Sequence, residues 1–456
     1  MSPPSLRDPG AILLLSFYEL GHQPHGLALT QAFLERAGWS PCPVDLAVEP
    51  LGDEAIDAAR LVVFVVPMHT ALRLAIAAAA RIRGRHPAAR HCFLGHYASL
   101  NEATLRRLGA DFVLGGEAEE ELVRLCQRLA TEEPSPPASS PVLTRLAFPL
   151  PSRRELPALG RYARAFRDGE EVLAGYTEAS RGCRHLCRHC PLPPLYGGRL
   201  FVVPVEVVVA DAVQQQRAGA RHLTFGDPDF LNAPRHALAI ARALHRQLPE
   251  LTFDFTAKVE HLLHHAALLP ELFALGARFV TTAVESLSDE ILAILDKGHT
   301  AADVERLVPI VAASGLALRP TLLPFTPWTT LDDYRALVHF VERHDLHDQV
   351  DPVQLALRLL VPPGSLLADH PAFTPHRGAL DEGALSYAWR HPDPRLDRLQ
   401  AQVFAVAARA AESEEPAPRT HRAIHLLAAG AAGLDPPSLP PRPERQSPRL
   451  AEPWFC

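Results

Sequence analysis

The sequence has little cysteine and no basic stripe, and both shortages exclude classes of protein. Its seven cysteines are an odd number in 456 residues, and one tight cluster holds three of them. This usage argues against a disulfide-stabilised scaffold and favours a metal site in a reducing cytosol. The net charge is −7, with Lys and Arg scattered, so nothing resembles the basic surface that neutralises a nucleic-acid backbone. We therefore expect a small-molecule substrate or protein partner and no nucleic acid.

An uninterrupted apolar run long enough to span a bilayer is also missing. The most apolar window, residues 61–80, is long enough to span a bilayer, but Pro67, His69 and Arg73 interrupt it. It predicts a buried strand, a loop and an Ala-rich helix. The first ten residues lack the charged and apolar regions of a signal peptide. Together these absences predict a cytoplasmic protein with no membrane contact.

The length predicts two or three domains. Residues 11–130 alternate continuous apolar runs with helical patterns, which is typical of a parallel sheet covered on both faces and predicts a first domain over residues 1–130. A doubly wound sheet of this kind binds ligands beyond the carboxyl ends of its strands. That edge is predicted to carry four segments, namely residues 18–26, 67–70, 95–98 and 115–121.

The second half predicts another α/β unit. Residues 131–171 begin with a Pro-, Ser- and Glu-rich stretch and are predicted to be a linker. Alternating strand and helix patterns resume over residues 172–366 and fit a full or partial (β/α)6 barrel, whose chemistry lies at the carboxyl ends of its strands. Residues 367–456 read as a helical and proline-rich extension. The predicted fold class is therefore α/β, with a doubly wound sheet followed by a barrel.

The cysteine cluster consists of Cys183, Cys187 and Cys190 and precedes a proline-rich turn. Three thiolates can ligate three irons of a 4Fe-4S cluster and leave the fourth iron open to an outside ligand. Structural zinc, completed by His185 or His189, is the alternative. Zinc ligands usually come as two separated pairs, however, and no second closely spaced pair follows. Three unligated thiols are the remaining interpretation.

The spacing Cys183-x3-Cys187-x2-Cys190, placed after a predicted strand, resembles the signature of the radical S-adenosylmethionine (SAM) superfamily. Three later segments resemble further pieces of that family in the same order: LTFGDPDF (223–230), FVTTAVESLSDEILAILDKGHTAADV (279–304) and LRLLVPPGS (357–365). The resemblance implies a 4Fe-4S cluster on the three cysteines, SAM bound to the open iron, and an electron donor such as flavodoxin or ferredoxin. It also implies reductive cleavage of a carbon–sulfur bond of SAM.

Five residues are implied SAM contacts. The resemblance places Gly226 and Asp227 at the ammonium group, and Glu285 and Ser286 at the ribose and carboxylate. Arg319 is a candidate for a SAM or substrate carboxylate, because its guanidinium can bind such a group through two hydrogen bonds.

Other polar residues lie near the predicted strand ends, and each of them has a candidate functional or structural role. Lys258 and Glu260 alternate at the end of the third predicted strand and are candidate catalytic residues, with an ion pair at the barrel rim as the alternative. Asp229 is well placed to cap the helix that follows it. The His-rich residues 260–269 predict a solvated helix face rather than a metal site, because the adjacent His264 and His265 diverge around a helix.

The N-terminal domain and the C-terminal tail carry two further resemblances. Residues 109–125 resemble cobalamin-binding domains, but residues 18–26 lack the Asp-x-His-x-x-Gly loop that supplies a lower-axial histidine. Cobalamin is therefore a candidate second cofactor, and a structural or substrate-binding platform is the alternative. The tail SPRLAEPWFC resembles a radical SAM (seleno)protein family with a Cys-Sec-Ala-Glu-Pro or Cys-Cys-Ala-Glu-Pro tail. Here Arg449 and Leu450 replace the Cys-Sec or Cys-Cys pair, which leaves Cys456 as the candidate tail thiol.

These features favour a radical SAM transferase that forms a bond by methyl or other alkyl transfer. Transfer of a 3-amino-3-carboxypropyl group to a soft nucleophile, such as trivalent arsenic, is the alternative that the tail suggests. A non-catalytic metal-binding protein that recruits a partner is the alternative from another class.

Overall fold

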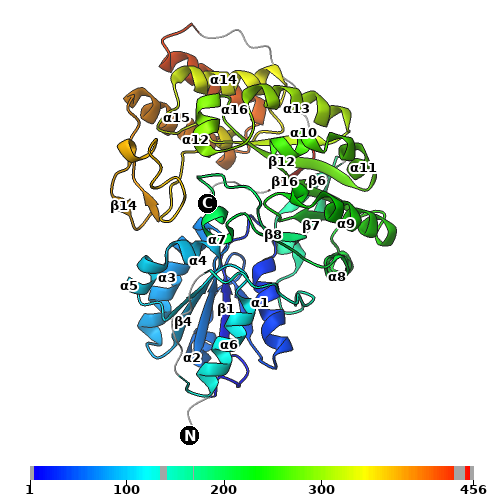
Figure 1. The fold of residues 1–456 in the computed structure, drawn as a ribbon, viewed down its shortest axis with the longest axis vertical. Helices are drawn as coiled ribbons and strands as arrows, with labels where there is room; N and C mark the ends of the chain where they lie inside the picture. Colours follow the sequence, from blue (N-terminus) through cyan, green and yellow to red (C-terminus); the bar gives the residue numbers. More distant parts are fainter. Residues whose placement is uncertain (1–4, 134–140, 168, 436–446, 452–456) are drawn as a thin grey trace.

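The structure is a computed structural model that describes residues 5–133, 141–167, 169–435 and 447–451. Two α/β units are stacked along the long axis of the molecule, with the N-terminal sheet at one end and a second, curled sheet above it (Figure 1). This arrangement confirms the predicted α/β fold class. No helix in the described part of the chain has the length and apolar character needed to cross a bilayer.

The N-terminal sheet has the strand order β2-β1-β3-β4-β5, and all its neighbouring strands are parallel. This is one of the two common orders of doubly wound sheets. The strands are β1 (Ile12–Ser16), β2 (Cys42–Asp45), β3 (Leu61–Val65), β4 (Arg90–Leu94) and β5 (Phe112–Leu114). The window 61–80 forms β3, a loop and the first part of a helix, which confirms its predicted structure.

Side chains that alternate along these strands pack against helices on opposite faces. The side chains of Ile12 and Leu14 lie on one face of the sheet, which is covered by α1 (His25–Arg36) and α6 (Glu119–Ala130). Those of Leu13 and Leu15 lie on the other face, which is covered by α2 (Asp53–Ala58), α3 (His69–Arg85) and α5 (Glu102–Arg107). A short helix, α4 (His96–Leu100), follows β4 at the carboxyl edge. Burial on both faces explains why the strands read as continuous apolar runs.

The second sheet has the order β13-β12-β11-β10-β7-β6-β16. Its parallel strands are β7 (Glu170–Thr177), β10 (His222–Phe225), β11 (Thr252–Thr256), β12 (Ala277–Glu285) and β13 (Ala317–Leu322). Two antiparallel strands, β6 (Arg164–Arg167) and β16 (Arg449–Ala451), extend it beyond β7. The helices that follow its strands are α8 (Val205–Arg217), α9 (Pro234–Gln247), α10 (Val259–His264), α11 (Leu269–Ala274), α12 (Asp289–Leu295), α13 (Ala301–Ala313) and α14 (Leu331–Arg343).

A sixth parallel strand does not form at residues 357–365. This segment is irregular and pairs with the residues after β13 through a single bridge between Phe325 and Arg358. Beyond this bridge, Pro362 and Pro363 have no backbone N–H with which to extend the pairing, and Gly364 has a φ of 75°. The unit is therefore a half-barrel of five parallel strands.

The C-terminal residues pack on the half-barrel. Helices α15 (Pro394–Glu412) and α16 (Ala417–Ala431) contact each other, α14 and the short helix η4 (Pro352–Ala356), while a two-stranded ribbon joins β14 (Leu380–Asp381) to β15 (Ser386–Tyr387). The remaining short helices are η1 (Leu159–Arg161), η2 (Phe230–Asn232), η3 (Ala266–Leu268) and η5 (Thr374–His376). Cys456, the candidate tail thiol, lies outside the described residues.

A buried arginine in the segment that connects the two units forms contacts with both of them. Arg153 forms an ion pair with Asp211 of α8, with Nε 2.7 Å from Oδ1. It also donates hydrogen bonds to the side chain of Gln23 and to the backbone carbonyl of Tyr176. The connecting residues therefore contact both the N-terminal unit and the half-barrel. The facing edges of these two units enclose a common space.

Candidate functional site

The cysteine loop begins at the carboxyl end of β7, where a short antiparallel pair of β8 (Ser180–Gly182) and β9 (Leu200–Val202) flanks it. Gly182, directly before Cys183, has a φ of 77°, and a Cβ there would lie 2.4 Å from the carbonyl oxygen of Arg199. Only glycine fits this turn without strain. The loop ends in α7 (Leu192–Tyr196), whose early prolines suit the first turn of a helix.

The three thiols of the loop share a partly apolar environment. Cys183 and Cys187 are buried, and Cys190 is half-buried. Burial raises the pKa of Cys183 and raises that of Cys190 to about 12. No described cysteine forms a disulfide. Soft sulfur donors that interact electrostatically with one another in a largely buried loop suit an iron–sulfur cluster, whose binding must displace their protons.

A buried ion pair lies beside the loop. Glu285 ends β12 with a φ of 63°, and its Oε1 is 3.1 Å from Nζ of Lys297 and 3.2 Å from Nε2 of His189. Burial alone would raise the pKa of Glu285, but the Lys297 ammonium and His189 hold it below its ordinary value. The carboxylate is therefore ionised and held in place next to Cys187 and Cys190, whose thiols interact electrostatically with Lys297.

The turn after β10 brings two of the predicted SAM contacts to the same end of the half-barrel. Gly226 lines a cavity, and a Cβ there would lie 1.9 Å from the hydroxyl oxygen of Tyr176. Asp227 instead accepts hydrogen bonds from the backbone N–H of Ala179 and from the hydroxyl of Ser180. Burial raises the pKa of Asp227 to about 7. Asp227 thus fastens the start of the cysteine loop to β10.

Ser286 and Asp229 have local partners as well. The hydroxyl of Ser286 accepts a hydrogen bond from the backbone N–H of Ser288, and its side chain is buried beside Glu285. Asp229 caps the short helix η2 through the N–H of Leu231, which confirms the predicted capping role.

The structure corrects the expectation that Lys258 and Glu260 alternate along one strand. Strand β11 ends at Thr256, so Lys258 directly precedes α10 and Glu260 lies in the first turn of that helix. Their charged groups are 3.5 Å apart, as an ion pair at the rim would require. Arg319 also has a protein partner, since its Nη2 is 2.7 Å from Oδ2 of Asp351. Catalytic or SAM-binding roles for these residues stay predictions.

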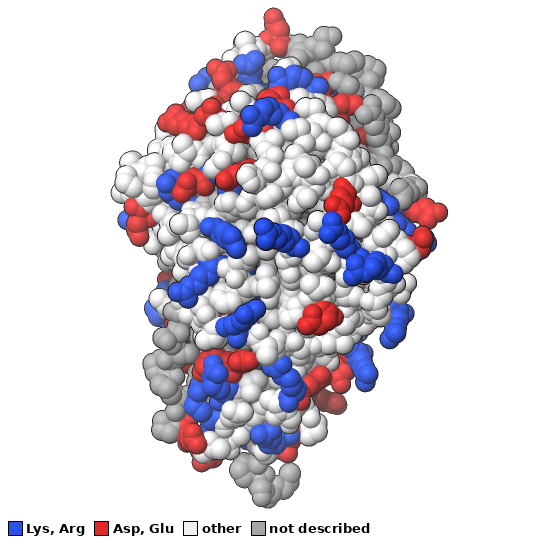
Figure 2. Space-filling view, turned by 45° about the vertical axis from the view of Figure 1, so that its right-hand side comes forward, with Lys and Arg blue, Asp and Glu red and all other residues white. Residues whose placement is uncertain are grey.

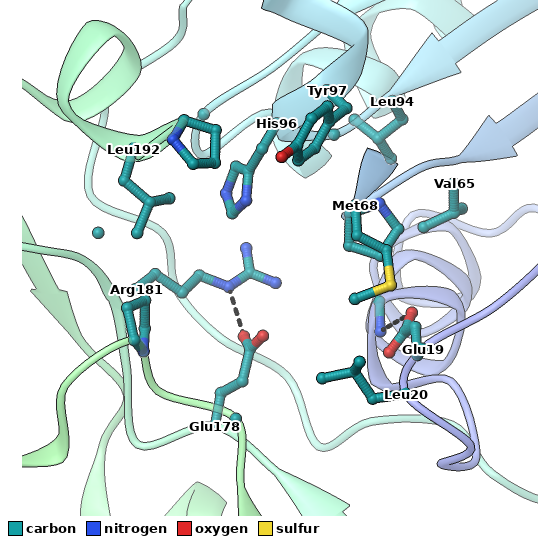
Figure 3. Close-up of a pocket in the computed structure, with 18 of the residues that line it drawn as sticks. Glu19, Leu20, Val65, Met68, Leu94, His96, Tyr97, Glu178, Arg181 and Leu192 are labelled. Atoms are coloured by element: carbon teal, nitrogen blue, oxygen red, sulfur yellow. Dashed lines mark hydrogen bonds and ion pairs between the residues drawn. The ribbon is translucent and has the colours of Figure 1, made fainter. Parts of the chain in front are cut away.

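A cavity of about 340 Å³ separates the cysteine loop from the carboxyl edge of the N-terminal sheet. Figure 3 shows side chains from both units around it. All four segments predicted at that edge contribute to its wall. Its lining includes Leu20, Val65, Met68, Leu94, His96, Tyr97 and Glu119 from the N-terminal unit, and Tyr176, Glu178, Arg181, Cys190, Leu192 and Gly226 from the half-barrel.

Arg181 joins the two walls of this cavity. Its guanidinium is 2.6 Å from a carboxylate oxygen of Glu119 in α6 and 3.0 Å from one of Glu178 after β7 (Figure 3). On the opposite wall, the buried Glu19 accepts hydrogen bonds from the backbone N–H groups of His25 and Gly26, while burial raises its pKa to about 8. The cavity thus combines apolar side chains with a few fixed polar groups, as ligand sites do.

Sequence reasoning missed Lys297, Arg181 and Glu178. Lys297 lies within the segment 279–304 that carries the family resemblance, so its position was a usable signal. The pairing of Arg181 with Glu119 joins residues 62 positions apart, and no local pattern reports such a contact.

Comparison with known proteins agrees with this geometry. Residues 177–341 match the radical SAM superfamily. Curated relatives include the ribosomal protein uS12 methylthiotransferases RimO of Anaeromyxobacter sp. (strain Fw109-5), 30% identical over 182 residues, and of Myxococcus xanthus (strain DK1622), 27% identical over 176 residues. In both cases the match covers 37% of this chain and 37% of the relative. The chain therefore matches only part of these proteins.

Solved structures match over more of the chain. The cobalamin-dependent SAM radical enzyme OxsB, with aqua-cobalamin and SAM bound, has a TM-score of 0.68 and 14% identity, covering 92% of this chain and 71% of its own. The radical SAM methyltransferase TsrM from Kitasatospora setae, with tryptophan and a SAM analogue bound, has a TM-score of 0.57 and 19% identity, covering 74% of this chain and 71% of its own. At these identities the likeness concerns the fold. Together with the match over residues 177–341, it identifies a radical SAM domain in this chain.

Proposed function

We propose that the protein is a radical SAM enzyme that transfers a methyl or other alkyl group to a small molecule. The observation that carries the proposal is the shared cavity, whose wall contains Cys190 on one side and the strand ends of the N-terminal sheet on the other. A molecule held by the N-terminal unit would therefore face the cysteine loop directly.

The three cysteines are proposed to hold the cluster. A radical SAM domain uses a 4Fe-4S cluster and SAM, which together supply one-electron chemistry that the protein's own side chains cannot perform. The chain's residues would bind, orient and shield these groups. Gly226 would contact SAM through its backbone, and the packing of Tyr176 requires glycine there because any side chain would meet the Tyr176 ring. Glu285, kept ionised by Lys297, is suited to accept hydrogen bonds from ribose hydroxyls.

Cobalamin is the proposed second cofactor. Leu20, Val65, Met68 and Leu94 form an apolar wall at the sheet edge that suits the face of a corrin ring. His22 is not suited to ligate cobalt from below, because it is buried against the ring of Tyr176, with ring centroids 4.6 Å apart. The proposal is therefore a corrinoid held by the wall rather than by a histidine of the loop 18–26.

Retention of hydroxocobalamin after gel filtration tests this second cofactor. Met68→Arg places a charge in the wall and should abolish retention. Leu74→Arg is a matched control, since Leu74 lies in α3, the helix that Met68 directly precedes, with 48% of its surface exposed, and it should retain the corrinoid. Equal retention by both variants would refute the proposed binding wall.

An acidic electron carrier, such as a flavodoxin or ferredoxin, is the proposed reductant. Lys and Arg side chains are spread over the middle of one face of the molecule, while Asp and Glu are frequent toward its ends (Figure 2). Opposite charges accelerate association in a manner that salt suppresses. The rate of cluster reduction by such a carrier should therefore fall as ionic strength rises.

The activity itself is tested by the nucleoside products of SAM. Anaerobically reconstituted protein is reduced with SAM present, and the products are separated by chromatography, with Cys187→Ala as control. 5′-Deoxyadenosine together with S-adenosylhomocysteine would support radical methylation. 5′-Methylthioadenosine would instead support transfer of the aminocarboxypropyl group, including transfer to trivalent arsenic. Zinc without iron, and intact SAM, would favour a non-catalytic metal-binding protein.

A further inference from the structure

A second group of metal-binding side chains lies beside the cysteine loop and uses none of its thiols. It consists of His185, Asp229 and His261. His185 lies in the loop between β8 and α7, Asp229 follows β10, and His261 belongs to α10, which follows β11. Three separate segments thus bring two imidazoles and one carboxylate together at the carboxyl end of the half-barrel.

The spacing of the donor atoms suits a small divalent ion. Oδ2 of Asp229 is 3.5 Å from Nε2 of His185 and 2.7 Å from Nδ1 of His261, and the three atoms lie within 4.8 Å of one another. A tetrahedral zinc ion with bonds of about 2.0–2.1 Å holds its donor atoms about 3.3 Å apart. The observed distances lie on both sides of this value, so small side-chain rotations would bring all three atoms to the ion.

The same three atoms lack hydrogen-bond partners among the described residues. Asp229 is fully buried, and the N–H of Leu231 occupies its other oxygen, Oδ1. A metal-free triad, in which Asp229 pairs electrostatically with both imidazoles, is the alternative. A buried carboxylate oxygen needs a partner, and one ion would satisfy all three atoms.

A carboxylate lies near the second ring nitrogen of His185. Oε2 of Glu260 lies 3.9 Å from the second ring nitrogen of His185, and nearby carboxylates commonly orient such ligands. The backbone N–H of His185 interacts with the thiol of Cys183, so an ion here would also steady the cysteine loop. This arrangement differs from the expected solvated face at residues 260–269, because His261 turns inward to Asp229.

We propose that His185, Asp229 and His261 bind a divalent transition-metal ion, with zinc the best match to two histidines and one carboxylate. Three protein ligands leave a fourth position for water or for an oxygen or nitrogen of a substrate at the mouth of the half-barrel. The proposal does not depend on the proposed transfer reaction, because its readout is metal content and ligand type.

The test adds zinc to the anaerobically purified, cluster-reconstituted full-length protein and removes the excess by gel filtration in the presence of a weak chelator. Mass spectrometry of the metals gives zinc and iron per chain, and X-ray absorption at the zinc edge gives the ligand atoms. Stoichiometric zinc with only nitrogen and oxygen neighbours, at unchanged iron content, is the expected result.

Variants on one helix sharpen the test. His261→Ala should lose the zinc while keeping its iron, and His261→Gln provides the same test if the alanine variant does not fold. His264→Ala, a neighbour on α10 outside the triad, should keep both metals. The proposal is wrong if the unaltered protein holds no zinc, if the zinc has sulfur neighbours, or if the His261 variants retain as much zinc as His264→Ala.

Discussion

Lys297→Met removes the cation that balances a buried carboxylate beside the cysteine loop. Lys297 is 3% exposed and Glu285 is 9% exposed, so the substitution leaves an ionised group in a dry site. Breaking a buried ion pair in this way costs about 3–5 kcal/mol. Because His189 stays 3.2 Å from the same oxygen, we expect a loss near the lower limit, about 3 kcal/mol.

Thermal unfolding followed by circular dichroism under anaerobic conditions measures this loss. A loss of about 3 kcal/mol corresponds to a fall of about 6–12 °C in the transition of the half-barrel. The double variant Lys297→Met with Glu285→Gln should recover most of the loss, because it also removes the unpaired charge. Arg335→Met, which breaks an exposed ion pair with Asp332, should cost less than about 1 kcal/mol. A double variant no more stable than Lys297→Met would refute the reasoning.

Two further substitutions, at Gly226 and His421, test the effect of local packing and of burial on the stability of the fold. Gly226→Ala should destabilise the protein by about 1–3 kcal/mol in urea unfolding, because its Cβ would meet the Tyr176 hydroxyl, whereas Gly160→Ala has open space and should be neutral. Burial lowers the pKa of His421 to about 4. The unfolded chain therefore binds this proton below about pH 6.5 and the folded protein does not, so the contribution of His421 to stability should fall by about 3 kcal/mol between pH 6.5 and 4. His421→Asn should flatten that part of the urea-midpoint profile, and an unchanged slope would contradict the assignment.

Local patterns explain which features of the fold were predictable. Continuous apolar strands predicted the parallel sheets, and the segments expected at the N-terminal sheet edge all reach the cavity. The failures depend on details that such patterns do not contain. The early end of β11 at Thr256 moves Glu260 onto a helix, and the segment expected as a sixth strand forms only one bridge.

Long-range contacts explain the rest of what the sequence did not reveal. Arg181 pairs with Glu119 across the two units, and His261 meets Asp229 from a neighbouring loop. Glu285 obtains its partners only because β12 ends with a left-handed residue that turns the carboxylate toward Lys297 and His189. Apart from the pair of Glu285 with Lys297, each of these contacts joins elements that lie far apart in the sequence.

The central claim is that the cysteine loop holds a cluster whose open iron binds SAM. Electron paramagnetic resonance of the reduced, reconstituted protein tests it most directly, recorded with and without SAM and with Cys187→Ala as control. The account predicts a 4Fe-4S signal whose shape changes when SAM is added, and no such signal from the variant. A cluster signal that SAM leaves unchanged, or one that survives loss of Cys187, would contradict it.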